Sequence, residues 1–296
     1  MLVSCCKITQ FFGIPAVYFI EYCYFCKDMC TGHPLSLNLG GQLLELCQPI
    51  VMGILNCTPD SFYAASREQT VDAALRRAEQ ILREGGTIID IGACSTRPGS
   101  TPVDEAEEMN RLEGVLNAVR QHWPDALLSV DTFRAGVAQR CIAEWGVQLI
   151  NSVAPTDFTP ALPTNVAQVV TSHAATMEQI LTDLSQRVEN LQAGGQRDII
   201  IDPGFGFGKT TEENFRVLEQ LPLLSAFNLP VLVGVSRKRM LQQTVDAPAE
   251  QTLNATTAVH MAALERGANI LRVHDVAQAV ETVKVFAALK CEKQNR

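Results

Sequence analysis

The sequence predicts one α/β domain, a (β/α)8 or TIM barrel, over residues 48–296. Two observations support this fold class. Eight short apolar runs rich in β-branched residues alternate with longer segments, most of which show helical periodicity. The apolar runs are continuous rather than alternating in polarity, as is typical of strands buried on both faces of a parallel sheet. A doubly wound open sheet is the alternative, because one sequence does not define the order of the strands.

The predicted elements follow one another with short connections. The expected strands are 50–56, 87–92, 127–132, 149–153, 168–173, 198–203, 231–236 and 270–276. The expected helices are 71–84, 104–121, 134–145, 177–193, 212–221, 251–266 and 277–289. Thr70 is positioned to cap the first helix, which Gly85 and Gly86 would end. The connection 154–167 contains three prolines and is the least helical.

The first forty residues do not follow this alternation, and we expect residues 1–40 to be a poorly ordered leader of unknown role. Their apolar run 11–20 is too short for a membrane-spanning helix, which needs about 20 residues. An alternative interpretation is a zinc or iron–sulfur site, because Cys23, Cys26, Cys30 and His33 are suitable ligands.

The charge and the remaining cysteines bear on partners and location. The formal net charge is −8, which disfavours a nucleic-acid-binding protein because phosphate contacts need clustered Lys and Arg. The cysteines after residue 40 are scattered singly, as in proteins of a reducing compartment. We therefore expect a cytoplasmic protein with neither a nucleic-acid nor a membrane partner.

Polar or charged residues stand at the end of every predicted strand, where the loops that carry the active sites of such barrels begin. They include Asn56, Asp90, Arg97, Asp131, Asn151, His173, Asp202, Ser236, Lys238, Arg272 and His274. One such residue alone is explained by a structural hydrogen bond. Eight strands out of eight predict a binding site, because a buried polar group costs free energy unless it is paired.

These polar residues divide by chemistry into two sets. Carboxylate and amide groups, which suit a heterocycle with several N–H donors, come from Asp131, Asn151 and Asp202. Basic groups, which suit phosphate oxygens, come from Arg97, Lys238, Arg272 and His274. The neutral oxygen of Asn56 is suited to Mg²⁺ beside a diphosphate.

The glycine-rich segment 204–210 contrasts with a nucleotide-binding P-loop. A P-loop requires four residues between its first glycine and the Gly-Lys pair, whereas only three separate Gly204 from Gly208. Pro203 also occupies a position that would need glycine. We expect Phe207 to form part of a pocket floor, with Lys209 near the rim.

At this point the sequence strongly resembles the dihydropteroate synthase family of pterin-binding barrels. The matching motifs are MGILNCTPDSF at 52–62, IIDIG at 88–92, STRPG at 95–99, SVDT at 129–132, IN at 150–151, DPGFGFGK at 202–209, GVSRK at 234–238 and LRVHD at 271–275. They occur in the family's order between about residues 48 and 290. No single motif would be as specific as the combination.

The resemblance implies a Mg²⁺-assisted transferase of folate biosynthesis, usually a homodimer. Such enzymes join 6-hydroxymethyl-7,8-dihydropterin pyrophosphate to p-aminobenzoate, giving 7,8-dihydropteroate and pyrophosphate.

Site roles also follow from the resemblance, residue by residue. The implied catalytic groups are Asp131, Asp202, Lys238 and Arg272, and the same four with Asn151 bind the pterin. The implied pyrophosphate contacts are Asn56, which also lies near Mg²⁺, Arg272 and His274. The residues implied to bind substrate elsewhere are Thr96 and Arg97 on the second loop, and Phe62, Pro98 and Ser236 near p-aminobenzoate.

The sequence departs from the family pattern at four places. Residues 93–94 are Ala-Cys instead of Gly-Glu, 63–67 replace an Asp-Gly-Gly turn, and Ser152 stands where Asp is usual. The loop 172–177 around His173 is shortened. This last change leaves open what the fifth strand contributes to the pterin pocket.

Two other functions compete with the synthase. A related barrel could transfer a methyl group from a folate to a cobalamin protein, but it would not need the basic set. A non-catalytic pterin-binding or scaffold protein would bind pterin without releasing pyrophosphate.

Overall fold

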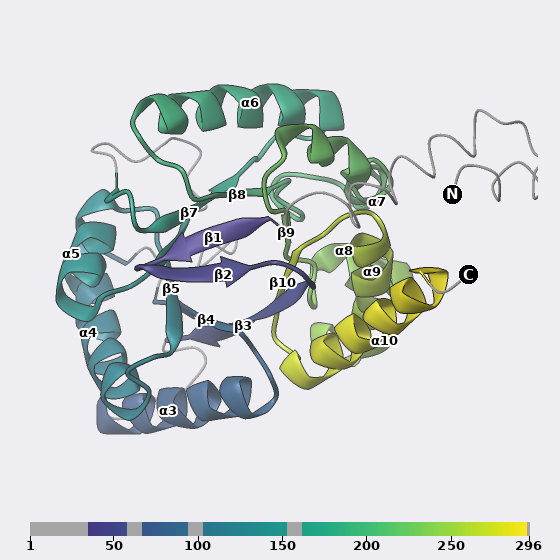
Figure 1. Ribbon diagram of the computed structural model, residues 1–296. Coiled ribbons are helices and arrows are strands. Elements are labelled where there is room, and N and C mark those ends of the chain that lie inside the picture. The colour runs from purple at the N-terminus through teal and green to yellow at the C-terminus, as the bar shows by residue number, and fades with distance from the viewer. Residues whose placement is uncertain (1–34, 58–66, 94–102, 153–161, 295–296) are drawn as a thin grey trace, which may run out of the picture. The chain divides into compact units, whose positions relative to one another are not determined.

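The computed structural model describes residues 35–57, 67–93, 103–152 and 162–294, and Figure 1 labels most of their elements. Residues from Ser36 onward belong to one compact unit. Four of the predicted substrate residues lie outside the described residues, namely Phe62, Thr96, Arg97 and Pro98. The candidate zinc or iron–sulfur ligands in the first 34 residues also lie outside them.

Eight strands alternate with helices along the chain, as the sequence predicts. The strands are β3 (Ile50–Asn56), β4 (Ile88–Gly92), β5 (Leu127–Asp131), β6 (Leu149–Ser152), β7 (Ala167–Thr171), β8 (Ile199–Asp202), β9 (Leu232–Val233) and β10 (Ile270–Val273). The described α-helices are α3 (Arg67–Arg83), α4 (Glu105–His122), α5 (Ala135–Trp145), α6 (Met177–Ala193), α7 (Thr211–Glu219), α8 (Arg239–Val245), α9 (Leu253–Glu265) and α10 (Val276–Gln294).

The strands form a closed parallel barrel. Their hydrogen-bonded order is β8-β7-β6-β5-β4-β3-β10-β9. A parallel bridge between Ile201 and Val231 joins β8 to the segment that enters β9, where the N–H of Ile201 donates to the carbonyl of Pro230 over 2.9 Å. In Figure 1 the helices surround the strands. The predicted (β/α)8 barrel is therefore confirmed, and the open-sheet alternative is wrong.

Alternate residues along each strand face the two sides of the barrel wall. One set joins the large apolar cluster formed with the helices, for example Ile89, Ile91 and Val130. The other set faces the barrel interior and becomes polar towards the C-terminal strand ends, where Asp90, Asp131 and similar residues lie. The apolar cluster thus stabilises the barrel wall, and the inner face carries the polar groups of the candidate site.

Strand register brings the polar inner residues to the same height. Asn56 of β3 pairs with Gly92 of β4, Gly92 pairs with Asp131 of β5, and Asp131 pairs with Asn151 of β6. These four positions form one continuous row across neighbouring strands. The backbone pairing alone therefore groups three of the predicted site residues.

A β-hairpin that the sequence analysis did not predict precedes the barrel. Strand β1 (Ser36–Leu39) pairs antiparallel with β2 (Gln42–Glu45). The turn residues Gly40 and Gly41 have positive φ angles of 65° and 94°, which glycine adopts without strain. The compact unit therefore starts before the expected boundary near residue 48.

The hairpin lies against the N-terminal ends of the barrel strands. The N–H of Asn38 donates to Asp198, just before β8, over 2.7 Å. The N–H of Gly40 donates to the carbonyl of Asn165, just before β7, over 2.9 Å. Figure 1 shows the hairpin crossing the centre of the ring of strands. This end of the barrel is thus covered by the chain itself, and the C-terminal strand ends remain for a binding site.

Three helical segments differ from the expectation. Helix α3 begins at Arg67, so Thr70 lies within the helix instead of capping it, because residues 67–69 are good helix formers. Helix α7 is followed by a 3-10 helix at Leu221–Phe227, where Pro222 cannot continue α-helical hydrogen bonding. Helix α8 was not predicted, since seven residues are too few to show helical periodicity.

Candidate active site

Asp90 is the central buried group at the C-terminal end of the barrel. Its side chain lies on β4 in the otherwise apolar strand IIDIG and is fully buried. It accepts hydrogen bonds from Ser129 Oγ at 2.6 Å, Asn151 Nδ2 at 3.1 Å and Arg272 Nε at 2.6 Å. Three donors satisfy a carboxylate that would otherwise be costly to bury. Asp90 thereby connects β4 to β5, β6 and β10.

Arg272 bridges two carboxylates. While its Nε donates to Asp90, its Nη2 donates to Oδ2 of Asp131 over 2.6 Å. Burial alone would lower the pKa of Arg272, but the two neighbouring carboxylates raise it, so the guanidinium stays charged. Burial raises the pKa of Asp131 to about 7, and the positive charge of Arg272 partly offsets this effect. The protonation state of Asp131 is therefore sensitive to its contacts near neutral pH.

Lys238 and Asp202 form the opposite side of the site. Lys238 stands at the N-terminal end of α8, and its Nζ donates to the carbonyl oxygen of Phe205. Burial lowers the pKa of Lys238 to about 8, against the attraction of Asp202. Burial likewise raises the pKa of Asp202, against the attraction of Lys238. Each group favours the charged form of the other, as expected for a facing acid and base.

The glycine-rich segment after β8 supports these groups with its backbone. The N–H of Gly204 donates to Oδ1 of Asp202 over 2.8 Å, and Lys209 Nζ donates to the carbonyl of Gly204 over 2.8 Å. A Cβ atom at Gly204 would lie 1.8 Å from the carbonyl oxygen of Ser172, and its φ is +71°. Glycine is therefore required here, because any side chain would collide with the end of β7.

An aromatic pair lies beside Lys238. The rings of His173 and Phe207 are stacked, with centroids 4.6 Å apart and an interplanar angle of 6°. The Nζ atom of Lys238 lies 5.0 Å from the centroid of the Phe207 ring. The pair places an apolar surface next to the charged group of Lys238.

A small space adjoins Asn56. A Cβ atom built on Gly92 would lie 3.7 Å from Asn56 Oδ1 and 4.0 Å from Asp131 Oδ2. Glycine leaves this space empty, so an amide oxygen and a carboxylate oxygen face the same opening. Oxygen ligands of this kind fit a hard cation such as Mg²⁺.

The segment after β10 is hydrogen-bonded to the segment after β9 and to α3. Both the N–H of His274 and its Nδ1 lie 3.2 Å from Ser236 Oγ. Arg77 on α3 donates to the carbonyl oxygens of Ile54, at 3.1 Å, and His274, at 2.5 Å. These bonds fix the backbone that follows β3 and β10.

The structure brings together most of the described site residues predicted from the sequence. Direct contacts or register join Asn56, Asp131, Asn151 and Arg272, and a second group contains Asp202, Lys238 and Phe207. Ser236 and His274 contact each other at the seventh and eighth strand ends. The other predicted site residues are not among the described residues, namely Phe62, Thr96, Arg97 and Pro98.

Sequence reasoning missed the role of Asp90 as the shared partner of three site groups. It also missed Arg77, whose place on a helix gave no sign of its contact with the end of β10. An aspartate in the middle of an apolar strand was the available signal for Asp90, because such a charge is tolerated only with partners.

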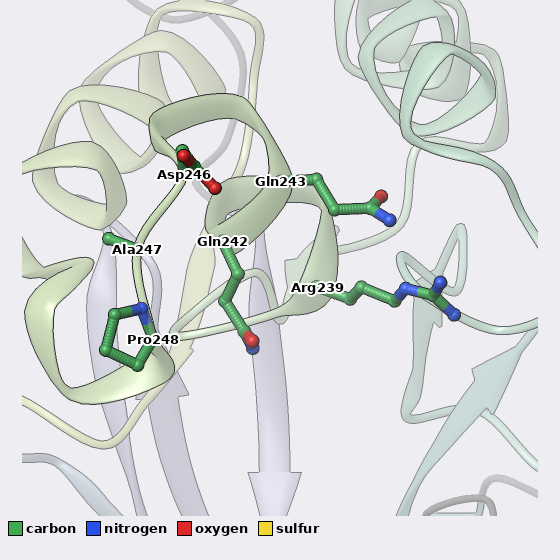
Figure 2. Close-up of a pocket in the computed structure, with 6 residues that line it drawn as sticks. All are labelled: Arg239, Gln242, Gln243, Asp246, Ala247 and Pro248. Atoms are coloured by element: carbon green, nitrogen blue, oxygen red, sulfur yellow. The ribbon is translucent and has the colours of Figure 1, made fainter.

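A separate surface pocket of about 400 Å³ lies on and after α8. Figure 2 shows its lining residues, Arg239, Gln242, Gln243, Asp246, Ala247 and Pro248. None of the predicted site residues lines it, although Arg239 directly follows Lys238. We assign it no role in the chemistry.

The described residues contain neither a cluster of metal ligands nor a membrane-spanning helix. Within ranges 35–57, 67–93, 103–152 and 162–294, no three His, Cys, Asp or Glu side chains cluster as metal ligands. Over the same part of the chain, none of the helices has both the length and the apolarity needed to span a membrane.

Comparison with known proteins places the chain among pterin-binding proteins. A family model described as pterin binding enzyme matches residues 52–274. A dihydropteroate synthase of Haemophilus influenzae is 37% identical over 86% of this chain and 98% of the relative. A dihydropteroate synthase of Escherichia coli is 34% identical over 88% of this chain and 99% of the relative.

Solved structures agree with the sequence relatives. A dihydropteroate synthase of Xanthomonas albilineans with 4-aminobenzoic acid has a TM-score of 0.78 and 35% identity, over 87% of this chain and 98% of that one. A dihydropteroate synthase of Coxiella burnetii in complex with pteroic acid has a TM-score of 0.77 and 31% identity, over 86% of this chain and 98% of that one.

The contacts of Asp90 predict a large stability loss when its charge is removed. Asp90→Asn deprives Arg272 of a buried partner, and breaking such a pair should lower the free energy of unfolding by about 3 kcal/mol. The control is Glu107→Gln, which breaks an exposed pair with Arg111 and should cost less than about 1 kcal/mol. Urea unfolding measures both, and equal losses would contradict the central role of Asp90.

Proposed function

The chain belongs to the dihydropteroate synthase family of pterin binding enzymes, and we propose that its strand-end residues carry out the synthase reaction. It is a transferase of folate biosynthesis. The reaction joins 6-hydroxymethyl-7,8-dihydropterin diphosphate to p-aminobenzoate and releases pyrophosphate. The observation that carries the assignment of residues is the grouping of buried acids, an amide and two cations at one end of the barrel.

The acids and the amide bind the pterin in this proposal. Asp131 on β5, Asn151 on β6 and Asp202 on β8 offer oxygen acceptors and an amide to the N–H groups and ring nitrogens of the heterocycle. Lys238 faces Asp202 and supplies a donor at the same end. The stacked rings of His173 and Phe207 would contact the flat face of a bound ring system.

The diphosphate lies towards the basic groups. Arg272 reaches from the pterin acids to the diphosphate, and His274 and Asn56 follow at the adjoining strand ends. Ser236, which contacts His274, is assigned to p-aminobenzoate in this proposal. The family motifs assign Phe62 and Pro98 to the same substrate. Thr96 and Arg97 belong to the second loop in this assignment, which follows the family motifs at those positions.

The chemistry is a substitution at the methylene carbon of the pterin. The C–O bond to the diphosphate breaks, the C–N bond to the arylamine forms, and the amine loses one proton. Buried Asp202 and partly buried Asp131 stabilise positive charge that develops on the pterin, while Arg272 stabilises the leaving diphosphate. Bond cleavage can then run ahead of attack, and an aromatic amine is nucleophilic without strong general-base help.

We propose Asn56 as the Mg²⁺ ligand. The opening over Gly92, where Asn56 Oδ1 and Asp131 Oδ2 face the same space, fits an oxygen-coordinated cation. When bound, Mg²⁺ would neutralise charge on the diphosphate.

Purified protein should release pyrophosphate only when the pterin diphosphate and p-aminobenzoate are both present. Adding EDTA should abolish the release, and excess Mg²⁺ should restore it. Pyrophosphate is measured with a coupled enzyme assay, and dihydropteroate by chromatography. A folded protein that binds pterin but forms no product would sink the proposal in favour of a pterin-binding protein, and methyl transfer to a cobalamin protein would replace it with the third candidate.

The lowered pKa of Lys238 predicts an alkaline limit to activity. The ammonium is present below its pKa of about 8 and is lost as the pH rises through that value. The value of kcat/KM for the pterin diphosphate, which reports the free enzyme, should therefore fall about tenfold per pH unit above pH 8. Initial rates between pH 6 and 10 measure this fall.

Arginine variants of Lys238 and Lys209, whose pKa values are both lowered, show which of the two lysines causes the alkaline fall in activity. Lys238→Arg should abolish the alkaline fall, because a guanidinium stays protonated, although the rate at pH 7 will be lower. Lys209, whose pKa burial also lowers to about 8, is the matched control, and Lys209→Arg should keep the fall. An unchanged alkaline limb in Lys238→Arg would assign the titration to another group.

We further propose a cytoplasmic homodimer. The described cysteines Cys47, Cys57 and Cys141 are free thiols, which suits a reducing compartment. Helix α10 exposes Val285 and Leu289, 53% and 50% accessible and one turn apart, as a candidate contact with a second copy.

The double variant Val285→Glu/Leu289→Glu should sediment as a 32 kDa monomer, and the wild type at twice that mass. Leu223→Glu, at an equally exposed leucine on the 3-10 helix, is the control and should stay dimeric. Sedimentation velocity reports the masses, and a monomeric wild type would end the homodimer proposal.

A further inference from the structure

Thr171 is a buried residue at the end of β7 that the assigned site does not use. Its side chain is fully buried. Its Oγ1 atom finds no hydrogen-bond partner among the residues that the structure describes. A buried hydroxyl without a partner costs about 1–3 kcal/mol, so its presence calls for a physical reason.

Strand geometry directs this side chain into the barrel. Thr171 is the register partner of Asp202, and paired residues of neighbouring strands point to the same face. The preceding residue, Val170, belongs to the apolar cluster on the helix side of the wall. Thr171 therefore shares the inner face with Asp202.

The position lies between two proposed pterin ligands. In the barrel, β7 stands between β6, which carries Asn151, and β8, which carries Asp202. Those two side chains are themselves only 2% and 6% exposed, so the proposed heterocycle site is a deep layer. Thr171 is level with Asp202, and it lies two residues further along β7 than Val169, which pairs with Asn151.

The surroundings fix how Thr171 is presented. Arg187 on α6 donates to the carbonyl oxygen of Thr171 over 2.7 Å. The N–H of Ser172 donates to the carbonyl oxygen of Asp202 over 2.9 Å. The Cγ2 methyl of Thr171 lies 3.3 Å from the Cβ position of Gly204. The methyl group thus faces the glycine-rich segment, and the hydroxyl occupies a different staggered direction.

We propose that the Thr171 hydroxyl is a further substrate-contacting group, which hydrogen-bonds the pterin between Asn151 and Asp202. It supplies the contribution of the fifth barrel strand, where the loop around His173 is shortened. A hydroxyl both donates and accepts, so it fits a heterocycle whose ring nitrogens and N–H groups alternate. This inference rests on the proposed synthase function.

The test compares Thr171→Val, Thr171→Ser and the wild type. Valine keeps the shape and removes the hydroxyl, so the Kd for 6-hydroxymethyl-7,8-dihydropterin diphosphate, measured by calorimetry, should rise about three- to tenfold. The KM for p-aminobenzoate should stay within about twofold, and serine should restore the affinity for the pterin. Ser172→Ala, which removes the neighbouring buried hydroxyl that accepts a hydrogen bond from the N–H of Ala174, is the matched control and should bind like the wild type.

A purely structural hydroxyl gives a different pattern. Replacing an unpartnered buried hydroxyl by a methyl group should then leave the Kd unchanged and the melting temperature equal or higher. That result would overturn the inference while leaving the synthase function intact. Failure of the wild type to bind the pterin diphosphate or form product would instead overturn the proposed function, and Thr171 with it.

Discussion

The bridge that Arg272 makes between Asp90 and Asp131 is the interaction on which the site depends. One guanidinium binds two carboxylates that come from different strands, and of the three groups Asp90 is fully buried while Arg272 and Asp131 are partly buried. Without the bridge, two facing acids would repel each other in a poorly solvated space. With it, Asp131 stays at its place in the row from Asn56 to Asn151, and Arg272 cannot swing away from the rim. The same bridge therefore stabilises the barrel wall and places the proposed reactive groups.

A second consequence of burial is that it works against the charged forms of the site's acids and of its lysine. Burial raises the pKa of Asp131 and Asp202 and lowers that of Lys238, so each charged form persists because an opposite charge faces it. A bound pterin on which positive charge develops would stabilise the acids further. In the proposed reaction, this arrangement would favour the charge distribution of a departing diphosphate over that of the resting site, which is the electrostatic requirement for catalysis.

The sequence predicted the barrel and most of the described site because both depend on regular features. Strand alternation placed the polar ends at one rim, and register then grouped Asn56, Asp131 and Asn151 without help from side chains. It included Asp90 among the polar residues of the strands but did not predict its three partners, and it did not predict Thr171. One acid or one threonine in an apolar strand has an ordinary structural explanation. It did not predict the hairpin at Ser36–Glu45 either, since two four-residue strands carry too little periodicity. What escaped prediction depends on tertiary contacts between residues far apart in the chain.

The glycine-rich segment after β8 shows why composition alone misleads about chemistry. A P-loop presents backbone N–H groups to a phosphate, whereas this segment presents carbonyl oxygens to cations: Phe205 accepts from Lys238 and Gly204 accepts from Lys209. The same turn directs the N–H of Gly204 back to Asp202, so it holds an acid and two lysines together. Because Gly204 tolerates no side chain against Ser172, the segment packs onto the end of β7 beside Thr171. A glycine run that resembles an anion site thus serves here to place positive charge, and it closes the side of the layer in which the pterin is proposed to bind.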